Sequence, residues 1–206
     1  AGCYPVHPAL LSVAMLQVSW PQGLDYTASV VSIDWGVKMI EPLRLARSLG
    51  SGAESMFAWQ DLLIGKQAAG IGNGLVLFLL VGGLFLLIIR EISWQIPAGF
   101  IAGNVLVALL LGAVNGEQFA SPTFYLLSGG TVYAAFFLAT DHTTSPVNPV
   151  PMLIYGFIGG ALLMTIRAFS NYTDGVVFAV LLVNMCTPLL DRITPKVRGL
   201  EGAENA

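Results

Sequence analysis

The chain has 206 residues, of which 55% are hydrophobic and only 10% are charged, whereas a soluble domain usually carries about 25% Asp, Glu, Lys and Arg. These charged side chains are too few to cover a soluble domain, and nine basic residues with a net charge of −3 exclude a nucleic-acid-binding surface. The long apolar runs do not alternate as strands of a membrane barrel would. The composition therefore predicts an all-α polytopic membrane protein whose surroundings are the lipid bilayer.

The first 66 residues divide into an apolar part and a charged part. Residues 1–20 contain no Asp, Glu, Lys or Arg, but their apolar run is short for a full span, so we expect the end of a membrane helix or a half-helix. Residues 21–66 hold nine of the charged residues and are predicted to be extramembrane. Within them, Pro42 and Gly50 mark the start and end of a short helix, which we expect to lie at the membrane interface.

Residues 67–191 are predicted to form a five-helix membrane domain, followed by a C-terminal tail at 192–206. A helix needs about 20 apolar residues to cross the hydrocarbon core, and five uncharged stretches reach or approach this length. About five full transmembrane helices are therefore expected in addition to the N-terminal partial helix, over residues 70–89, 96–114, 122–140, 151–167 and 174–190.

Glycines stand at special places in these spans. Gly99 and Gly103, and likewise Gly156 and Gly160, put small residues on one helix face, so we interpret both pairs as helix-packing devices. The Ser128–Thr131 segment lies in the middle of the third span with two adjacent glycines, which lower helix propensity by about 1 kcal/mol each. A broken helix, a close-packed cofactor ring and plain tight packing each explain this segment.

Polar groups in the spans are few. We interpret Arg167 and Asp174 as anchors at the membrane surface, and Asn104 and Asn184 as partners in interhelical hydrogen bonds. The sequence has no nucleophile–base pair, paired carboxylates or cysteine cluster, so it predicts no catalytic residue and no metal site.

Asp141 directly follows the third span, whose last residue is Thr140. An acidic side chain at a helix end, with hydroxyl groups around it, is typical of a site that guides a cation or proton into a membrane domain. A solvated Asp with local hydroxyl-to-backbone bonds is the alternative. An Asp at a helix C-terminus opposes the helix dipole, which favours a functional role, but both interpretations stay open from the residues alone.

Several motifs together resemble one known family. Leu126 to Pro146 reads LLSGG, then AFFLATD, then TSP; Ile92 to Pro97 reads ISWQIP; His7 to Leu11 reads HPALL. These runs are similar to the LLSGG…AFFxATDxxTSP, ISWRIP and NPAL elements of the family of D subunits from the Rnf electron-transport complex, which is related to the B subunits of the sodium-translocating NADH:quinone reductase. Gly175 to Asp191 is similar to the last helix of that family.

The resemblance implies a membrane subunit of an electron-transfer complex. The family has about ten spans in two inverted five-helix repeats that resemble urea transporters, and this chain corresponds to the second repeat. The complex couples electron flow from ferredoxin or NADH to NAD or quinone with Na⁺ or H⁺ transport. The partners implied are the other membrane and peripheral subunits of an Rnf-like complex. The location implied is the prokaryotic cytoplasmic membrane, with the C-terminus cytoplasmic and residues 21–66 outside.

The chain departs from the family at the cofactor. The family attaches FMN to a Thr in a [ST]GATPL motif, but the corresponding stretch reads VKMIEPL, with Glu41 at the position of the Thr. A carboxylate cannot form the phosphodiester and repels a phosphate. The next family motif, GxIPGSxGE, corresponds to the loop with Gly70, Gly72 and Asn73, which we assign as a possible flavin contact. We therefore expect noncovalent FMN or no flavin.

Asp141 is an acidic position of the family that this chain keeps. The resemblance therefore assigns Asp141, with Thr140 before it, to an ion path.

Three functions remain open from the sequence. The first is a subunit of a redox-driven ion translocase that does not itself bind NAD. The second is a channel or facilitator with a urea-transporter-like helix arrangement and no redox role. The third is a structural subunit that holds redox partners together.

Overall fold

The computed structural model describes residues 4–24, 41–70 and 72–193, and within these ranges every regular element is a helix. The predicted all-α class is therefore confirmed for the described residues. The elements are α1 (Pro8–Ser19), η1 (Pro21–Leu24), α3 (Pro42–Leu49), η2 (Gly50–Met56), α4 (Trp59–Ile64), α5 (Val76–Ile88), α6 (Gln95–Val114), α7 (Pro122–Leu127), α8 (Thr131–Tyr133), the π-helical turn η3 (Ala134–Leu138), α9 (Pro149–Phe169) and α10 (Val176–Leu190).

Parts of the predicted domain divisions lie outside the described residues. These are residues 1–3 of the predicted half-helix, residues 25–40 of the predicted extramembrane segment, residue 71 of the predicted membrane domain and residues 194–206 of the predicted tail. Most of the VKMIEPL stretch lies within residues 25–40.

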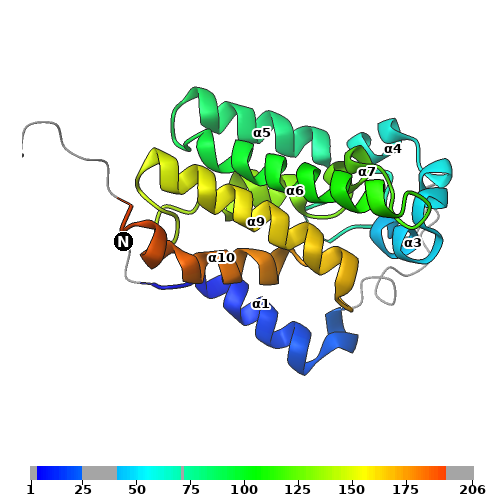
Figure 1. Ribbon diagram of the computed structural model, residues 1–206, viewed down its shortest axis with the longest axis horizontal. Helices are drawn as coiled ribbons and strands as arrows, with labels where there is room; N and C mark the ends of the chain where they lie inside the picture. Colours follow the sequence, from blue (N-terminus) through cyan, green and yellow to red (C-terminus); the bar gives the residue numbers. More distant parts are fainter. Residues whose placement is uncertain (1–3, 25–40, 71, 194–206) are drawn as a thin grey trace, which may run out of the picture.

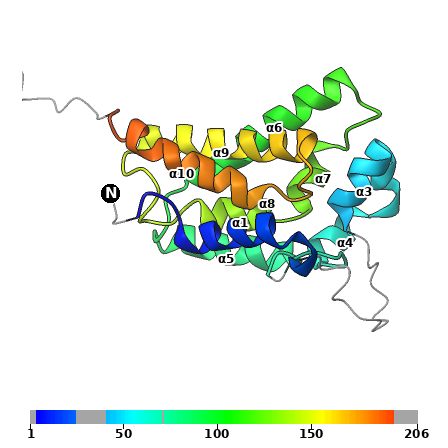
Figure 2. The same ribbon diagram turned by 90° about the horizontal axis from the view of Figure 1, so that it is seen from below.

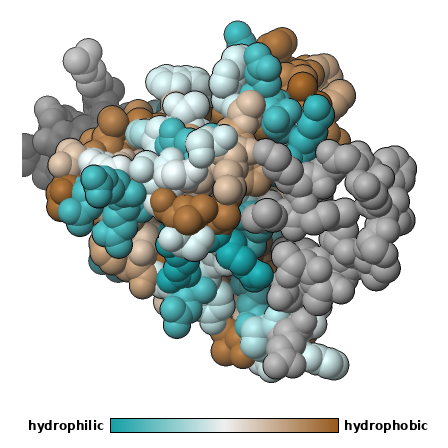
Figure 3. Space-filling model, turned by 90° about the vertical axis from the view of Figure 1, so that its right-hand side faces the viewer, coloured by the Kyte–Doolittle hydropathy of each residue, from teal (hydrophilic) through white to brown (hydrophobic). Residues whose placement is uncertain are grey.

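The long helices lie side by side along one direction. Figure 1 shows α5, α6, α9, α10 and α1 stacked across the molecule, with α3, α4 and α7 gathered at one end. Figure 2, turned by 90°, shows the same short helices at the same end. Figure 3 looks onto this end and shows hydrophilic and hydrophobic residues interspersed on it. The molecule thus has a bundle of long apolar helices and a cap of short ones.

The glycine pairs hold α6 and α9 in direct backbone contact, as predicted. A Cβ on Gly99 would lie 2.6 Å from the carbonyl oxygen of Leu153, and one on Gly156 would lie 3.0 Å from the nitrogen of Phe100. Further along, a Cβ on Gly103 would collide with the Phe157 carbonyl oxygen. Since both residue numbers rise together, the two helices run in parallel, and only glycine permits this approach.

The structure changes the lengths of the expected spans. α6 and α9, with 20 and 21 residues, are long and apolar enough to cross a membrane. α1, α5 and α10 are apolar but have 12, 13 and 15 residues, below the usual spanning length of about 17–25. The third expected span, residues 122–140, is not one helix, because it is divided among α7, α8 and η3.

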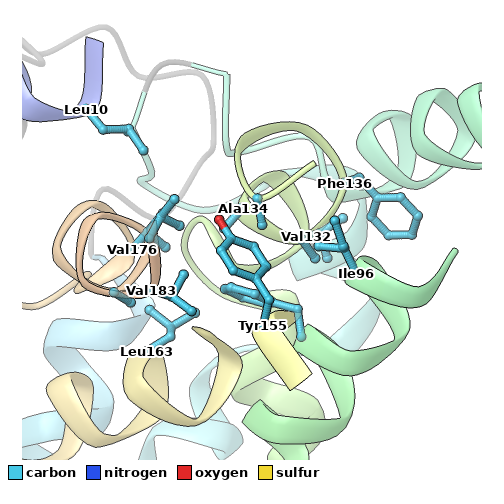
Figure 4. Close-up of a cluster of buried hydrophobic side chains, with 14 of the residues drawn as sticks. Leu10, Ile96, Val132, Ala134, Phe136, Tyr155, Leu163, Val176 and Val183 are labelled. Atoms are coloured by element: carbon cyan, nitrogen blue, oxygen red, sulfur yellow. The ribbon is translucent and has the colours of Figure 1, made fainter. Parts of the chain in front are cut away.

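Two clusters of buried apolar side chains form the core. The larger one fills the space between α5, α6, α9 and α10, and Figure 4 shows Tyr155 at its centre near Ala134 and Val183. The smaller cluster lies under the cap of short helices. Leu43 and Ala46 on α3 belong to it and are almost fully buried, so α3 packs this part of its apolar face on its own chain rather than on lipid.

Candidate functional site

The third expected span is broken between α7 and α8. Ser128 has an extended backbone, and Gly129 has a φ of +65° before α8 begins at Thr131. A residue with a Cβ adopts such a left-handed conformation at a cost of about 1–2 kcal/mol, which explains glycine at this position. The broken-helix alternative is therefore confirmed. A π-helical turn follows, in which the nitrogen of Ala139 donates to the oxygen of Ala134 at 2.8 Å.

An ion pair with a buried arginine stabilises the break between α7 and α8. The Arg167 guanidinium lies 2.8 Å from the Asp174 carboxylate, and it also donates to the Tyr125 carbonyl oxygen at 2.9 Å and to Thr131 Oγ1 at 2.7 Å. The second carboxylate oxygen of Asp174 accepts the Gly130 N–H at 2.8 Å. The Arg167 side chain is only 2% exposed. One ion pair therefore joins the end of α7, the start of α8 and the link between α9 and α10.

The prediction that Arg167 is an anchor at the membrane surface is wrong. α9 continues to Phe169, two residues beyond the predicted end, and carries Arg167 inward against the break. The signal in the sequence was the pair itself: two opposite charges seven residues apart across a short link in a chain with few charges. Buried charges in proteins are paired, so the sequence could have suggested that Arg167 and Asp174 form a buried pair next to the two adjacent glycines of the third span.

A cavity of about 690 Å³ lies beside the break. This volume is within the range of about 300–1,000 Å³ that small-molecule sites occupy. Its walls come from α1, the start of α3, the loop before α5, η3 and the link between α9 and α10. The lining residues that matter below are His7, Glu41, Asn73, Tyr133, Phe137 and Asp174.

The cavity brings together residues that the sequence associates with a flavin. Glu41, Gly70 and Asn73 all line it, although they come from separate segments. Gly72 is not among its lining residues; this glycine is exposed, with a φ of +90°. Glu41 precedes the first turn of α3, where its carboxylate lies 3.9 Å from the Arg44 guanidinium.

Aromatic side chains form part of the cavity wall. Tyr133 and Phe137 both line it, and their rings stack with centroids 5.7 Å apart. Carboxylates stand on other parts of the lining, namely Glu41 and Asp174, with Arg44 near the first and Arg167 against the second. The cavity lining therefore combines aromatic side chains with oxygen acceptors and locally compensated charge.

Asp141 and Thr140 do not line this cavity; they lie in the turn that follows η3, and Leu138 at the end of η3 does line it. The Asp141 carboxylate accepts hydrogen bonds from Thr143 Oγ1 at 2.5 Å and from Thr144 Oγ1 at 3.1 Å. Thr140 is buried, and its hydroxyl donates to the Phe136 carbonyl oxygen at 2.7 Å. α9 starts shortly after this turn, at the end of the molecule opposite α3 (Figure 1). The predicted ion-path residues thus lie toward the end of the bundle away from α3, whereas the cavity lining extends from His7 and Leu138 to Glu41 and Asp174.

Asn184 and Asn104, the two amides predicted to lie inside the membrane, differ in their hydrogen bonding. The Tyr155 hydroxyl lies 2.5 Å from the Asn184 amide, so the predicted interhelical bond is present between α9 and α10. Asn104 is fully buried on α6, and neither of its side-chain polar atoms has a hydrogen-bond partner among the described residues. The prediction for Asn104 is wrong. In the part of the chain that the structure describes, no group of three His, Cys, Asp or Glu side chains could hold a metal ion.

Parallel apolar helices in backbone contact, a broken helix held by a buried ion pair, and a cavity beside it define the class: a helical, membrane-type protein with an interrupted helix at a ligand-sized cavity. Residues 1–199 match the model of the NQR2, RnfD, RnfE family. The chain belongs to this family.

Curated relatives agree with the family match. The chain is 34% identical to the D subunit of the ion-translocating oxidoreductase complex of Alcanivorax borkumensis, over 96% of this chain and 64% of the relative. It is 36% identical to the D subunit of the Na⁺-translocating ferredoxin:NAD⁺ oxidoreductase complex of Acetobacterium woodii, over 92% and 57%. Identity to the D subunit of the ion-translocating oxidoreductase complex of Vibrio cholerae is 47%, over 86% and 51%. The chain thus spans roughly half to two thirds of the length of these relatives.

Proposed function

We propose that this chain belongs to a membrane subunit of a redox-driven ion-translocating complex, in which electron transfer is coupled to Na⁺ or H⁺ transport. The names of the relatives, which describe ion-translocating oxidoreductases, support the proposal. The observation that carries it is the cavity, because Glu41, Gly70 and Asn73 line one ligand-sized space beside a broken helix. Irregular backbone at membrane depth is tolerated where it lines such a cavity.

The proposed arrangement has five crossings in residues 67–191, with residues 1–20 as a partial helix, as in one repeat of a urea-transporter-like fold. The lengths of α6 and α9 support crossings by these two helices. In this arrangement the subunit is in a prokaryotic cytoplasmic membrane, with residues 21–66 outside and the tail 192–206 in the cytoplasm. Its partners are the other membrane and peripheral subunits of the complex.

The cavity suits a flat ring but not the covalent link of the family. Tyr133 and Phe137 contribute aromatic side chains to the lining, with their rings stacked on each other, and the volume accommodates a small aromatic cofactor. Glu41 has no hydroxyl with which to form a phosphodiester. We therefore propose that any FMN is held noncovalently here, by the aromatic wall and Asn73, where it would supply one- and two-electron transfer.

Acid precipitation of the purified complex tests the cofactor proposal. Noncovalent flavin is expected in the supernatant, and this polypeptide should show no flavin fluorescence on a denaturing gel. The relevant measurement is the flavin bound per polypeptide before and after precipitation. Fluorescence that stays with this chain would contradict our interpretation of Glu41, and the absence of flavin from every subunit would contradict a redox role.

Asp141, with Thr140 before it, is proposed as the access point for the transported ion. Its carboxylate already binds two hydroxyl groups, so it can either hold a loop in place or guide a cation between oxygen ligands. Asp141→Asn keeps the size and most hydrogen bonds but removes the charge. If the carboxylate serves the ion, this variant should lower ion uptake per electron by about tenfold, with a smaller effect on electron transfer.

The measurement compares ion uptake with electron transfer in proteoliposomes that contain the complex. Asp61→Asn is a suitable control, because Asp61 is an exposed carboxylate paired with Lys66 at 3.5 Å on the cap of short helices. Equal losses of ion uptake and electron transfer in Asp141→Asn would favour a structural role for the loop.

A further inference from the structure

A second, smaller cavity lies between α3, α7 and the end of α9, at the end of the molecule where Figure 1 shows the short helices. Its volume of about 190 Å³ is below the range of about 300–1,000 Å³ for drug-sized ligands. It shares one lining residue, Thr173, with the larger cavity, and Glu41 lines only the larger one. The small cavity is therefore a separate space, with room for a small chemical group rather than a flavin.

The polar side chains of the small cavity are cationic or neutral. Arg47 from α3 and Arg167 from α9 both line it, and no Asp or Glu among the described residues does so. Gln118, Tyr125 and Thr173 add an amide and two hydroxyl groups. A lining with two guanidinium groups, further donors and no carboxylate suits an anion.

Arg47 brings a positive charge that no described carboxylate neutralises. It lies in the last turn of α3, and its guanidinium donates to the carbonyl oxygen of Ser170, just beyond the last residue of α9. In the described part of the chain Arg47 forms no ion pair. A guanidinium has five N–H donors, so the bond to Ser170 leaves donors of Arg47 for a ligand in the cavity.

Arg167 is compensated only in part. One terminal nitrogen donates to the Tyr125 carbonyl oxygen and to Thr131 Oγ1, and the other donates to Asp174. The Nε–H has no acceptor among the described residues, although the side chain is almost fully buried. Buried N–H groups are nearly always hydrogen-bonded. Since Asp174 lines the larger cavity and not the small one, the two arginines share one carboxylate, on the far side of Arg167.

We propose that the small cavity binds a phosphate group, carried either by inorganic phosphate or by the headgroup of an anionic lipid. The planar fork of a guanidinium matches two phosphate oxygens at once, and arginine keeps its charge at every pH at which proteins are folded. In this site the phosphate oxygens accept hydrogen bonds from Arg47 and Arg167. The proposal goes beyond the redox function and does not depend on it.

The surroundings of the cavity make a lipid headgroup one of the two sources. The membrane-length helices α6 and α9 end on this side of the bundle, at Val114 and Phe169. Both end residues are largely exposed, at 77% and 72%, and Phe169 directly follows the lining residue Ala168. Basic pockets between membrane helices bind lipid headgroups. Acyl chains could therefore lie along these helix ends while the phosphate enters the cavity.

Two binding measurements on the purified complex distinguish the sources. In the first, the detergent-washed complex is equilibrated with radioactive orthophosphate at fixed ionic strength. In the second, it is reconstituted in vesicles of phosphatidylcholine and phosphatidylglycerol and extracted again, and the phosphatidylglycerol that it retains is counted by native mass spectrometry. Orthophosphate binding identifies free phosphate as a ligand, and retained phosphatidylglycerol without orthophosphate binding identifies the lipid.

Variants assign the bound phosphate to the cavity. Arg47→Gln should weaken binding by about tenfold or more, because it removes a charge and charge-assisted hydrogen bonds. Arg47→Lys should weaken it less, since it keeps the charge without the fork. Ala168→Leu, which fills the cavity and keeps both arginines, should also weaken binding. Lys66→Gln is the control, because it removes an exposed cation that pairs with Asp61 elsewhere on the cap.

Equal orthophosphate binding and equal lipid retention in the parent complex, Arg47→Gln and Ala168→Leu would overturn the proposal. A loss in Lys66→Gln as large as in Arg47→Gln would also overturn it, since net charge rather than the cavity would then hold the anion. If Arg47→Gln does not assemble, Arg47→Lys and Ala168→Leu decide the question. A complex that binds phosphate at this cavity and transfers no electrons would overturn the proposed redox function alone.

Discussion

Asp174→Asn is expected to lower the free energy of unfolding by about 3 kcal/mol, because it leaves the Arg167 guanidinium buried without its counter-charge. The pair is 2.8 Å apart, and the Arg167 side chain is 2% exposed while that of Asp174 is 24% exposed, so the guanidinium that loses its counter-charge is itself shielded from solvent. The Asn can still accept the Gly130 N–H, so the loss reflects charge rather than shape. Thermal unfolding of the purified protein in detergent, with and without the substitution, measures the effect.

The exposed pair of Lys66 and Asp61 provides the control for charge removal. These side chains are 58% and 37% exposed, so Asp61→Asn should change the free energy of unfolding by less than about 1 kcal/mol. The double variant Arg167→Leu with Asp174→Asn should recover part of the loss, since it removes the unpaired charge. If Asp174→Asn proves no more harmful than Asp61→Asn, Arg167 is not held by this ion pair.

Gly160→Ala is expected to destabilise the protein by about 3 kcal/mol, because the new methyl group collides with backbone that cannot rotate away. A Cβ at this position would overlap the Phe100 carbonyl oxygen and lie 2.9 Å from the nitrogen of Asn104. The parallel contact between α6 and α9 would have to open. Denaturation followed by circular dichroism measures the change.

The same substitution at Gly112 should have the opposite sign. Gly112 lies on α6, and a Cβ there meets nothing within 4 Å, so Gly112→Ala is expected to stabilise the helix by up to about 1 kcal/mol. The two variants differ only in what the methyl group touches. Similar effects of both substitutions would mean that helix propensity, not the backbone contact with α9, explains the glycines.

Features that depend on local pattern were predictable from the sequence. The spacing of Gly99 with Gly103 and of Gly156 with Gly160 predicted a close helix contact, because small residues four apart share one helix face. Pro42 and Gly50 likewise bracket α3 as expected. These predictions needed no knowledge of the distant parts of the chain.

Features that depend on tertiary pairing were not predictable from the sequence. Arg167 and Asp174 each stand at the edge of an apolar run. At such a position the sequence alone does not distinguish an anchor at the membrane surface from a member of a buried ion pair. Only the fold places them against Tyr125 and Thr131. Asn104 shows the opposite outcome. Its amide was expected to bond to another helix, but the fold buries Asn104 on α6 with no hydrogen-bond partner among the described residues.

The candidate cavity was predictable in part. The resemblance associated Glu41 with the loop at Gly70 and Asn73, and all three line the same cavity. Residues of α1 such as His7 could not be assigned to it, because nothing local in the sequence says which helix α1 packs on. In the structure α1 packs on α10, and the Asn184 amide lies 3.2 Å from the His7 nitrogen at the start of α1.

The backbone contact between α6 and α9 limits which parts of the molecule can move. Packed helices usually slide past each other by small shifts of their side chains, but glycine against backbone leaves no such layer of adjustable atoms. α6 and α9 must therefore move together as one rigid unit. Any opening or closing of the cavity has to come from the elements around these two helices, above all α1 and the broken segment between α7 and α8 that the Arg167–Asp174 pair holds in place.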